Sequence, residues 1–208
     1  MSSATTLWYF SDPMCAWCWG FTPIMEDIRN TYSERMNIVL MLGGLRTSST
    51  QPLTIRKRDE IMHHWFDSHR ITKQPFTFED ALPEGFIFNT EPACRAVITV
   101  AALNPAEIFP YFKTVQTAFF VEQMDVTQVD ILAELATRHG LTVEQFVEYF
   151  NSDDARQKTQ KHFRASEQAG VFGFPALVLE KNSKFQFITQ GYRPLQELMP
   201  PIEAWLKK

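Results

Sequence analysis

The stretch Ser11-Asp12-Pro13-Met14-Cys15-Ala16-Trp17-Cys18-Trp19-Gly20 decides the interpretation of the chain, because it holds two cysteines at a chemically informative place. It follows the short apolar run Leu7 to Phe10, which is typical of a buried strand. Ser11-Asp12-Pro13 ends that strand, and we expect a helix from about Cys15 to Tyr32, kinked at Pro23. The Cys-x-x-Cys pair therefore falls in the first turn of a helix.

That placement predicts redox chemistry. Two cysteines three residues apart in a helical turn lie close enough to form a disulfide with little strain. Cys15 sits where unpaired backbone N–H groups and the helix dipole stabilise a thiolate, which is the attacking species in thiol–disulfide exchange. We therefore expect Cys15 to be the exposed nucleophile and Cys18, one turn further in, to be the buried thiol that resolves a mixed disulfide.

The rest of the chain predicts a small α/β sheet interrupted by helices. A second buried strand is expected over 37–42, followed by Gly43-Gly44, and helical periodicity runs from about Pro52 to Gly170. Two further strands, over 175–179 and 184–189, and a helix over 194–205 close the chain. The order is β-α-β, a helical segment, then β-β-α. The predicted boundaries are residues 1–50, 51–168 and 169–208, with the middle part inserted in the sheet.

Several helix ends are marked by capping residues. Asn89 or Thr90 is expected to cap a helix with Pro92 in its first turn, and Asn104 to cap the next one. Thr142 begins a capping box, and Gly140 is expected to end the helix before it.

Composition excludes several functional classes. The 208 residues are 45% hydrophobic and 21% charged, with a formal net charge of −4, as in an ordinary folded protein rather than a nucleic-acid binder. The sequence has no apolar run long enough to span a membrane. The uncharged N-terminal stretch 1–6 does not resemble a secretory signal, so we expect a cytoplasmic protein. Three cysteines do not suffice for a disulfide scaffold.

A second motif supports the redox interpretation. Gly173-Phe174-Pro175-Ala176 directly precedes the third predicted strand, where a proline removes no ladder hydrogen bond. A proline in such a place can be cis, although the residues alone do not decide this.

Together the two motifs resemble the DsbA family of disulfide oxidoreductases, in particular its cytosolic DsbA-like or FrnE-like branch. The resemblance covers nearly the whole chain. It implies an α/β thioredoxin fold with a large inserted all-helical domain and a thiol–disulfide oxidoreductase or isomerase. It also implies a cis Phe174-Pro175 bond beside the cysteines, where backbone near Phe174 pairs with an extended substrate. Met14 and Trp17, which flank Cys15, are assigned with Phe174 and Pro175 to substrate binding.

The chain departs from that family at two places. Many thioredoxins carry a buried acid six residues before the first cysteine, where this chain has Tyr9. Asp12 is the nearest carboxylate in sequence to Cys18, and we interpret it as a supporting residue that caps the helix rather than one that shuttles protons. Ala16-Trp17 replaces the Pro-His of strongly oxidising enzymes, so we expect a less oxidising couple.

Structural interpretations of the same residues stay open. A zinc site needs two further ligands, for which Cys94 and the pair His63-His64 are the only candidates and have no partner pattern, so no metal is predicted. Alternatively, Cys15 and Cys18 are a pair of unreactive cysteines packed in the core. Cys94 is expected to be a buried, inert thiol, with a place near the active-site groove as the alternative. His63, His64 and His69 are expected on a solvated helix, and Phe76, Phe78, Phe119 and Phe120 in packing.

Two other functional classes compete with the oxidoreductase. The same fold with its insertion is also similar to that of the kappa-class glutathione transferases and the hydroxychromene carboxylate isomerases. Those proteins normally have Ser at the place of Cys15 and lack Cys18. A non-enzymatic peptide- or metal-binding chaperone would bind its client in the Phe-rich groove, with the cysteine pair as a latch. We expect no bound cofactor, with glutathione as a candidate redox partner. A reducing cytoplasm favours disulfide reduction or isomerisation of protein or small-molecule substrates over net oxidation.

Overall fold

The computed structural model describes residues 5–207, so part of the N-terminal stretch used above lies outside the described residues. Its core element is a four-stranded sheet in the order β2-β1-β3-β4. The strands are β1 (Thr6–Ser11), β2 (Asn37–Leu42), β3 (Ala176–Lys181) and β4 (Lys184–Gln190). β1 pairs with β2 in parallel and with β3 in antiparallel register, and β3 pairs with β4 in antiparallel register.

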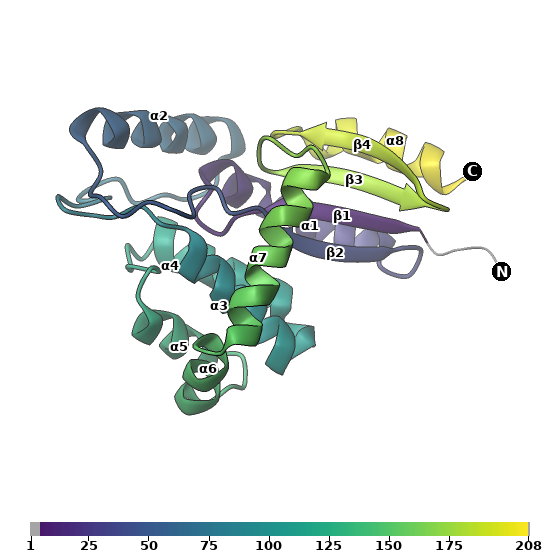
Figure 1. Ribbon diagram of the computed structural model, residues 1–208. Helices are drawn as coiled ribbons and strands as arrows, with labels where there is room; N and C mark the ends of the chain where they lie inside the picture. Colours follow the sequence, from purple (N-terminus) through teal and green to yellow (C-terminus); the bar gives the residue numbers. More distant parts are fainter. Residues whose placement is uncertain (1–4, 208) are drawn as a thin grey trace.

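The helices follow the predicted order. Those outside the insertion are α1 (Ala16–Tyr32) and α8 (Leu195–Leu206). Between β2 and β3 lie α2 (Ile55–Thr72), α3 (Glu91–Leu103), the short 3-10 helix η1 (Pro105–Glu107), α4 (Ile108–Phe120), α5 (Val129–Thr137), α6 (Val143–Phe150) and α7 (Asp153–Gln168). Figure 1 shows α1 and α8 behind the sheet, α7 crossing in front of it, and α3–α6 grouped to one side. The expected α/β fold with an inserted set of helices is confirmed.

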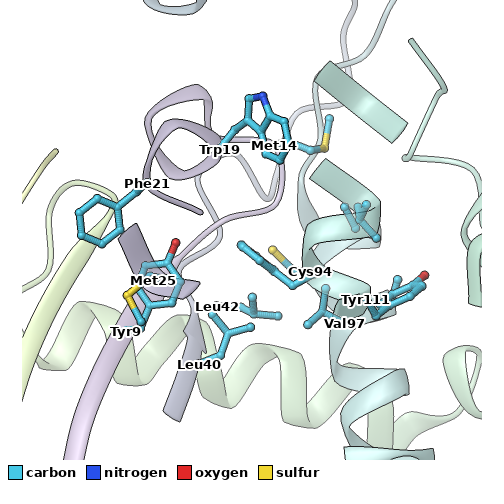
Figure 2. Close-up of a cluster of buried hydrophobic side chains, with 14 of the residues drawn as sticks. Tyr9, Met14, Trp19, Phe21, Met25, Leu40, Leu42, Cys94, Val97 and Tyr111 are labelled. Atoms are coloured by element: carbon cyan, nitrogen blue, oxygen red, sulfur yellow. The ribbon is translucent and has the colours of Figure 1, made fainter. Parts of the chain in front are cut away.

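The two faces of the sheet differ because successive side chains of a strand point to opposite sides. Leu7 and Tyr9 of β1 face the side covered by α1 and α8 and join the main core. Phe10 points the other way into a small cluster with Val171 and Val178. Figure 2 shows how Tyr9, Leu40 and Leu42 of the sheet meet side chains of α1 and of the inserted helices. One continuous core therefore joins the sheet to the insertion.

The capping predictions were partly correct. Thr142 forms the expected capping box with Gln145, and Gly140 has a φ of +78°, a conformation that glycine adopts without a steric penalty. The prediction for Asn104 was correct in position only. Asn104 is the N-cap residue of η1, with Pro105 following it, but its side chain makes no capping hydrogen bond and its amide donates to the carbonyl of His139 instead.

The aromatic packing predictions for Phe76, Phe78, Phe119 and Phe120 were confirmed. Phe76, Phe119 and Phe120 pack around Trp65, whose ring is 4.9 Å from that of Phe120. Phe66 of α2 is 52% exposed and stacks on Phe78 from the following loop. The loop 73–90 therefore covers the side of α2.

Candidate active site

Cys15 is the N-cap residue of α1, and Cys18 lies one turn inside that helix. Cys18 is fully buried, as expected. Cys15 is only 6% exposed, so its thiol is much less exposed than predicted. The reason is that Cys15 lies in the wall of a groove of about 220 Å³ rather than on an open surface, and its thiol donates to the carbonyl of Phe174 over 3.8 Å.

Cys18 is surrounded in a way that keeps it protonated. Burial raises the pKa of its thiol well above the ordinary value, and the neighbouring Cys15 raises it further. The Ser11 hydroxyl and the backbone of Asp12 act in the opposite direction but are weaker. The helix turn thus presents one thiol to a groove and holds the other, as a neutral group, behind it.

Tyr9 takes the place of the buried acid that many thioredoxins carry. Its side chain is 1% exposed, and its hydroxyl accepts a hydrogen bond of 2.9 Å from Ser11. Burial, followed by the proximity of Cys18, raises the pKa of Tyr9 well above its usual value. A neutral phenol and a hydroxyl group therefore lie beside Cys18.

Asp12 does not cap α1, which corrects the prediction. The helix has no side-chain cap at its N-terminus. The carboxylate instead accepts from the backbone N–H of Met14 over 2.8 Å and from that of Leu45 over 2.7 Å, and thereby ties the segment before Cys15 to the segment after β2. Burial raises the pKa of Asp12, and these backbone donors oppose that shift.

Cys94 lies directly behind this carboxylate. It is fully buried on α3, and its thiol is 3.5 Å from Oδ2 of Asp12. Burial and then the charge of Asp12 raise the pKa of Cys94 well above its ordinary value. The predicted burial is confirmed, and Cys94 packs beneath the site without lining the groove.

The second motif contributes one residue, Phe174, to the same groove. The Phe174–Pro175 peptide bond is cis, and Phe174 lines the groove beside Cys15. Gly43 makes room for its ring, because a Cβ atom there would lie 1.9 Å from Cζ of Phe174. The sequence analysis treated Gly43 only as the end of a strand and missed this role.

Of the residues assigned to substrate binding, Met14, Trp17 and Phe174 line the groove, whereas Pro175 is buried and is not among the lining residues. Much of the remaining wall was not predicted. Leu45 and Arg46 come from the segment after β2, and His64 from α2, where only a solvated face was expected. The carboxyl ends of the parallel strands β1 and β2 meet at one edge of the sheet, which is the signal that could have pointed to Leu45 and Arg46. The full lining is Met14, Cys15, Ala16, Trp17, Leu45, Arg46, Ile61, His64, Trp65, Phe88 and Phe174.

The other two histidines of α2 lie away from the groove. His63 is exposed and 3.3 Å from Asp67, and Nδ1 of His69 lies 2.7 Å from the carbonyl of Gln74. Within residues 5–207, no three His, Cys, Asp or Glu side chains gather in a way that could hold a metal ion. In the same part of the chain, no helix is both long and apolar enough to cross a bilayer.

Comparison with known proteins places the chain in a family. The model of the DSBA-like thioredoxin domain matches residues 6–198, and the chain belongs to this family of thiol–disulfide oxidoreductases. The predicted thioredoxin fold and DsbA-like relationship are thereby confirmed.

Individual relatives agree with this placement. A candidate protein disulfide isomerase from Nitrosomonas europaea is 47% identical, with a TM-score of 0.93, and the match covers 99% of this chain and 98% of that one. The cytosolic disulfide reductase DsbM from Pseudomonas aeruginosa is 25% identical, with a TM-score of 0.78 and coverage of 97% and 98%. The ClpXP adapter protein SpxH of Halalkalibacterium halodurans is 23% identical over 83% of this chain, which spans only 57% of that relative.

Proposed function

We propose that the protein is a thiol–disulfide oxidoreductase in which Cys15 attacks and Cys18 resolves. The observation that carries this proposal is the placement of Cys15 at the N-terminus of α1, in the wall of an open groove, with the neutral Cys18 directly behind it. A helix N-terminus favours the negative charge of an attacking thiolate.

The proposed reaction has two exchanges. The Cys15 thiolate attacks one sulfur of a substrate disulfide, so that a Cys15–substrate disulfide forms and the other substrate sulfur leaves as a thiolate and takes up a proton. Cys18 then loses its proton and attacks Cys15, which forms the Cys15–Cys18 disulfide and releases the second substrate thiolate. Two electrons pass from the cysteine pair to the substrate.

The order of the two exchanges follows from the surroundings of the thiols. Because burial raises the pKa of Cys18, this thiol stays neutral while Cys15 reacts. The Ser11 hydroxyl is the side-chain group that favours its thiolate, whereas the carboxylate of Asp12 is held by Met14, Leu45 and Cys94. We assign Ser11 to the stabilisation of Cys18 in the second exchange.

The groove has room for a substrate beside Cys15. Met14, Trp17 and Phe174 line it, and the Phe174 carbonyl accepts from the Cys15 thiol over 3.8 Å. We propose that an extended segment of the substrate pairs with the backbone near Phe174, as in other strand-addition complexes.

The proposed direction is reduction or isomerisation in the cytoplasm, with glutathione or a similar small thiol returning Cys15 and Cys18 to the reduced state. DsbM, at 25% identity, is described as a cytosolic disulfide reductase, and a second structure of it was determined with GSH. The cytosolic glutathione pool keeps thiols reduced, which favours the same direction.

Trapping of the mixed disulfide tests this proposal. Cys18→Ala should accumulate a Cys15–substrate adduct that mass spectrometry detects, Cys15→Ala should form none, and Cys94→Ala should turn over like the parent protein. The parent pair should also titrate as a two-electron couple between about −120 and −270 mV.

Other outcomes would favour the competing classes. Full catalytic turnover by Cys18→Ala with glutathione would indicate a glutathione transferase or isomerase. Unchanged client binding by Cys15→Ser, without any exchange activity in the parent protein, would indicate a chaperone or adapter.

A further inference from the structure

Arg46 is held at the mouth of the groove by buried groups. Its backbone N–H donates to the Thr90 hydroxyl over 3.2 Å, and its carbonyl accepts from the Thr90 N–H over 2.8 Å. Leu45, the residue before it, donates to the buried Asp12. Thr90 and Asp12 are both fully buried. Three hydrogen bonds to two buried residues therefore fix the backbone of this segment, while the Arg46 side chain lines the groove.

The guanidinium group of Arg46 has no ion-pair partner among residues 5–207. Glu60 is near enough for its pKa to be affected by Arg46, but its carboxylate is bound to Lys57 over 2.6 Å. The Arg46 side chain lies 5.8 Å from the centre of the Phe88 ring, which is itself part of the groove wall. The groove thus contains a positioned cation that no described residue pairs with.

The remaining lining has no charge that would oppose it. No Asp or Glu is among the lining residues, and the polar side chains other than Cys15 are those of Arg46, His64 and the two tryptophans. The walls are otherwise apolar, and a charge-assisted hydrogen bond is stronger where water is excluded.

We infer that the groove selects disulfides that carry a carboxylate close to the reacting sulfur, and that Arg46 binds this carboxylate. A guanidinium group is suited to the task because it offers paired donors in the geometry of a carboxylate. The inference rests on the proposed function, since it names the class of substrate for the Cys15 exchange. Such a carboxylate can belong to a small disulfide such as oxidised glutathione or to an acidic residue beside a cysteine in a peptide.

Matched substrates test the inference. Three peptide disulfides that differ only in Glu, Gln or Lys beside the reacting cysteine, and oxidised glutathione, would be reduced by the parent protein and by Arg46→Gln and Arg46→Lys. We expect the parent to prefer Glu over Gln in kcat/KM on the order of tenfold, the factor that one charge-assisted hydrogen bond supplies. Arg46→Gln should lose this preference, so that its kcat/KM values for the Glu and Gln peptides become similar, and Arg46→Lys should keep most of the preference.

Arg58→Gln is the matched control, because Arg58 is an exposed residue of α2 outside the groove and its loss changes the net charge equally. It should retain the preference. Thermal unfolding of each variant separates a local effect from a loss of fold.

The outcomes are distinct. A lower kcat/KM of Arg46→Gln than of the parent for oxidised glutathione alone, or a loss of the Glu preference alone, supports the inference and identifies the source of the carboxylate. The inference is overturned, with the oxidoreductase intact, if Arg46→Gln reduces oxidised glutathione as fast as the parent does and the peptides show either no Glu preference in the parent or one that survives in Arg46→Gln. An absence of exchange with every disulfide would instead contradict the proposed function.

Discussion

The wall of the groove and the layer of residues beneath it each contain a cysteine and a charged side chain, but the surroundings of these groups differ. Cys15 in the wall and Cys94 in the layer beneath are both nearly or fully buried thiols. Cys15 lies beside open space, whereas Cys94 and Asp12 lie against each other in the interior. The comparison shows that burial alone does not separate a reactive cysteine from a structural one, because access to a second sulfur atom also decides reactivity.

The same contrast applies to the charged groups. Arg46 in the wall has no ionic partner among the described residues, while the carboxylate of Asp12 beneath it accepts two backbone hydrogen bonds. Changes in the wall should therefore alter catalysis at little cost in stability, and changes beneath it should alter stability first. Four predictions test this division, from the largest effect to the smallest.

Cys15→Ser should abolish disulfide exchange, with a loss of at least about a thousandfold in rate, because a hydroxyl does not replace a thiolate nucleophile. Its free energy of unfolding should change by less than about 1 kcal/mol, since the two side chains are similar in size. Reduction of a peptide disulfide and urea unfolding measure the two quantities. A large loss of stability would contradict the assignment of Cys15 to the groove wall.

Asp12→Asn should lower the free energy of unfolding by about 2 kcal/mol, because the amide NH2 would face a backbone N–H that the carboxylate now accepts. The raised pKa of Asp12 means that the folded protein binds this proton more tightly than the unfolded chain does. The stability of the parent relative to Asp12→Asn should therefore be greatest at low pH and should fall as the pH rises through that pKa.

Urea unfolding of both proteins at several pH values checks this prediction. Asp130→Asn serves as the control, because Asp130 is exposed on α5 and should show neither effect. Equal stability of the parent and Asp12→Asn at every pH would refute the anchoring role of the carboxylate.

His162 on α7 also supports the segment after β2, since its Nδ1 accepts the N–H of Leu42 over 3.2 Å. Burial lowers its pKa to about 4. As the pH falls, the unfolded chain therefore takes up a proton on His162 at a higher pH than the folded protein does. The contribution of His162 to the free energy of unfolding is complete above about pH 6.5 and is lost as the pH falls towards 4. Between pH 7 and 4 the parent should lose about 2 kcal/mol more than His162→Gln, which keeps an acceptor but does not titrate. Parallel stability curves would rule out this contribution.

Cys94→Ala should have the smallest effect, a loss of about 1 kcal/mol, because it leaves a small void beside Asp12. Disulfide exchange should stay within about twofold of the parent rate, as expected for a residue outside the groove. Thermal unfolding and peptide reduction provide the readouts. A severe loss of disulfide exchange with normal stability would indicate that Cys94 takes part in the reaction.

Much of the fold could be predicted from the sequence because its signals are local. The apolar runs at Leu7 and Asn37, the cysteines after the first strand and the capping box at Thr142 depend on neighbours within a few residues. The assignment of Cys18 as a buried thiol followed from one helical turn. The side chain of Asn104 departs from the prediction because a distant segment offers it a better partner, the carbonyl of His139.

The candidate site was predictable only on the side built by its two motifs. Met14, Cys15 and Trp17 are consecutive with the helix start, and Phe174 is marked by the proline that follows it. Leu45, Arg46 and His64 carry no motif, and they reach the groove only because β2 lies parallel to β1 and α2 packs beside α1. The role of Asp12 was misassigned for the same reason, since its second acceptor bond goes to Leu45, 33 residues away.

By itself, the sequence determined the order of strands and helices, the helical turn that holds Cys15 and Cys18, and the proline motif opposite them, because these depend on residue type and short spacing. The tertiary structure alone decided which side chains surround the thiols. Packing of distant segments buries Cys18, couples Asp12 to Cys94 and Leu45, and brings Arg46, which has no ion-pair partner within residues 5–207, into the same groove as Cys15. Burial, pKa and charge pairing are properties of those surroundings, and no single stretch of chain contains them.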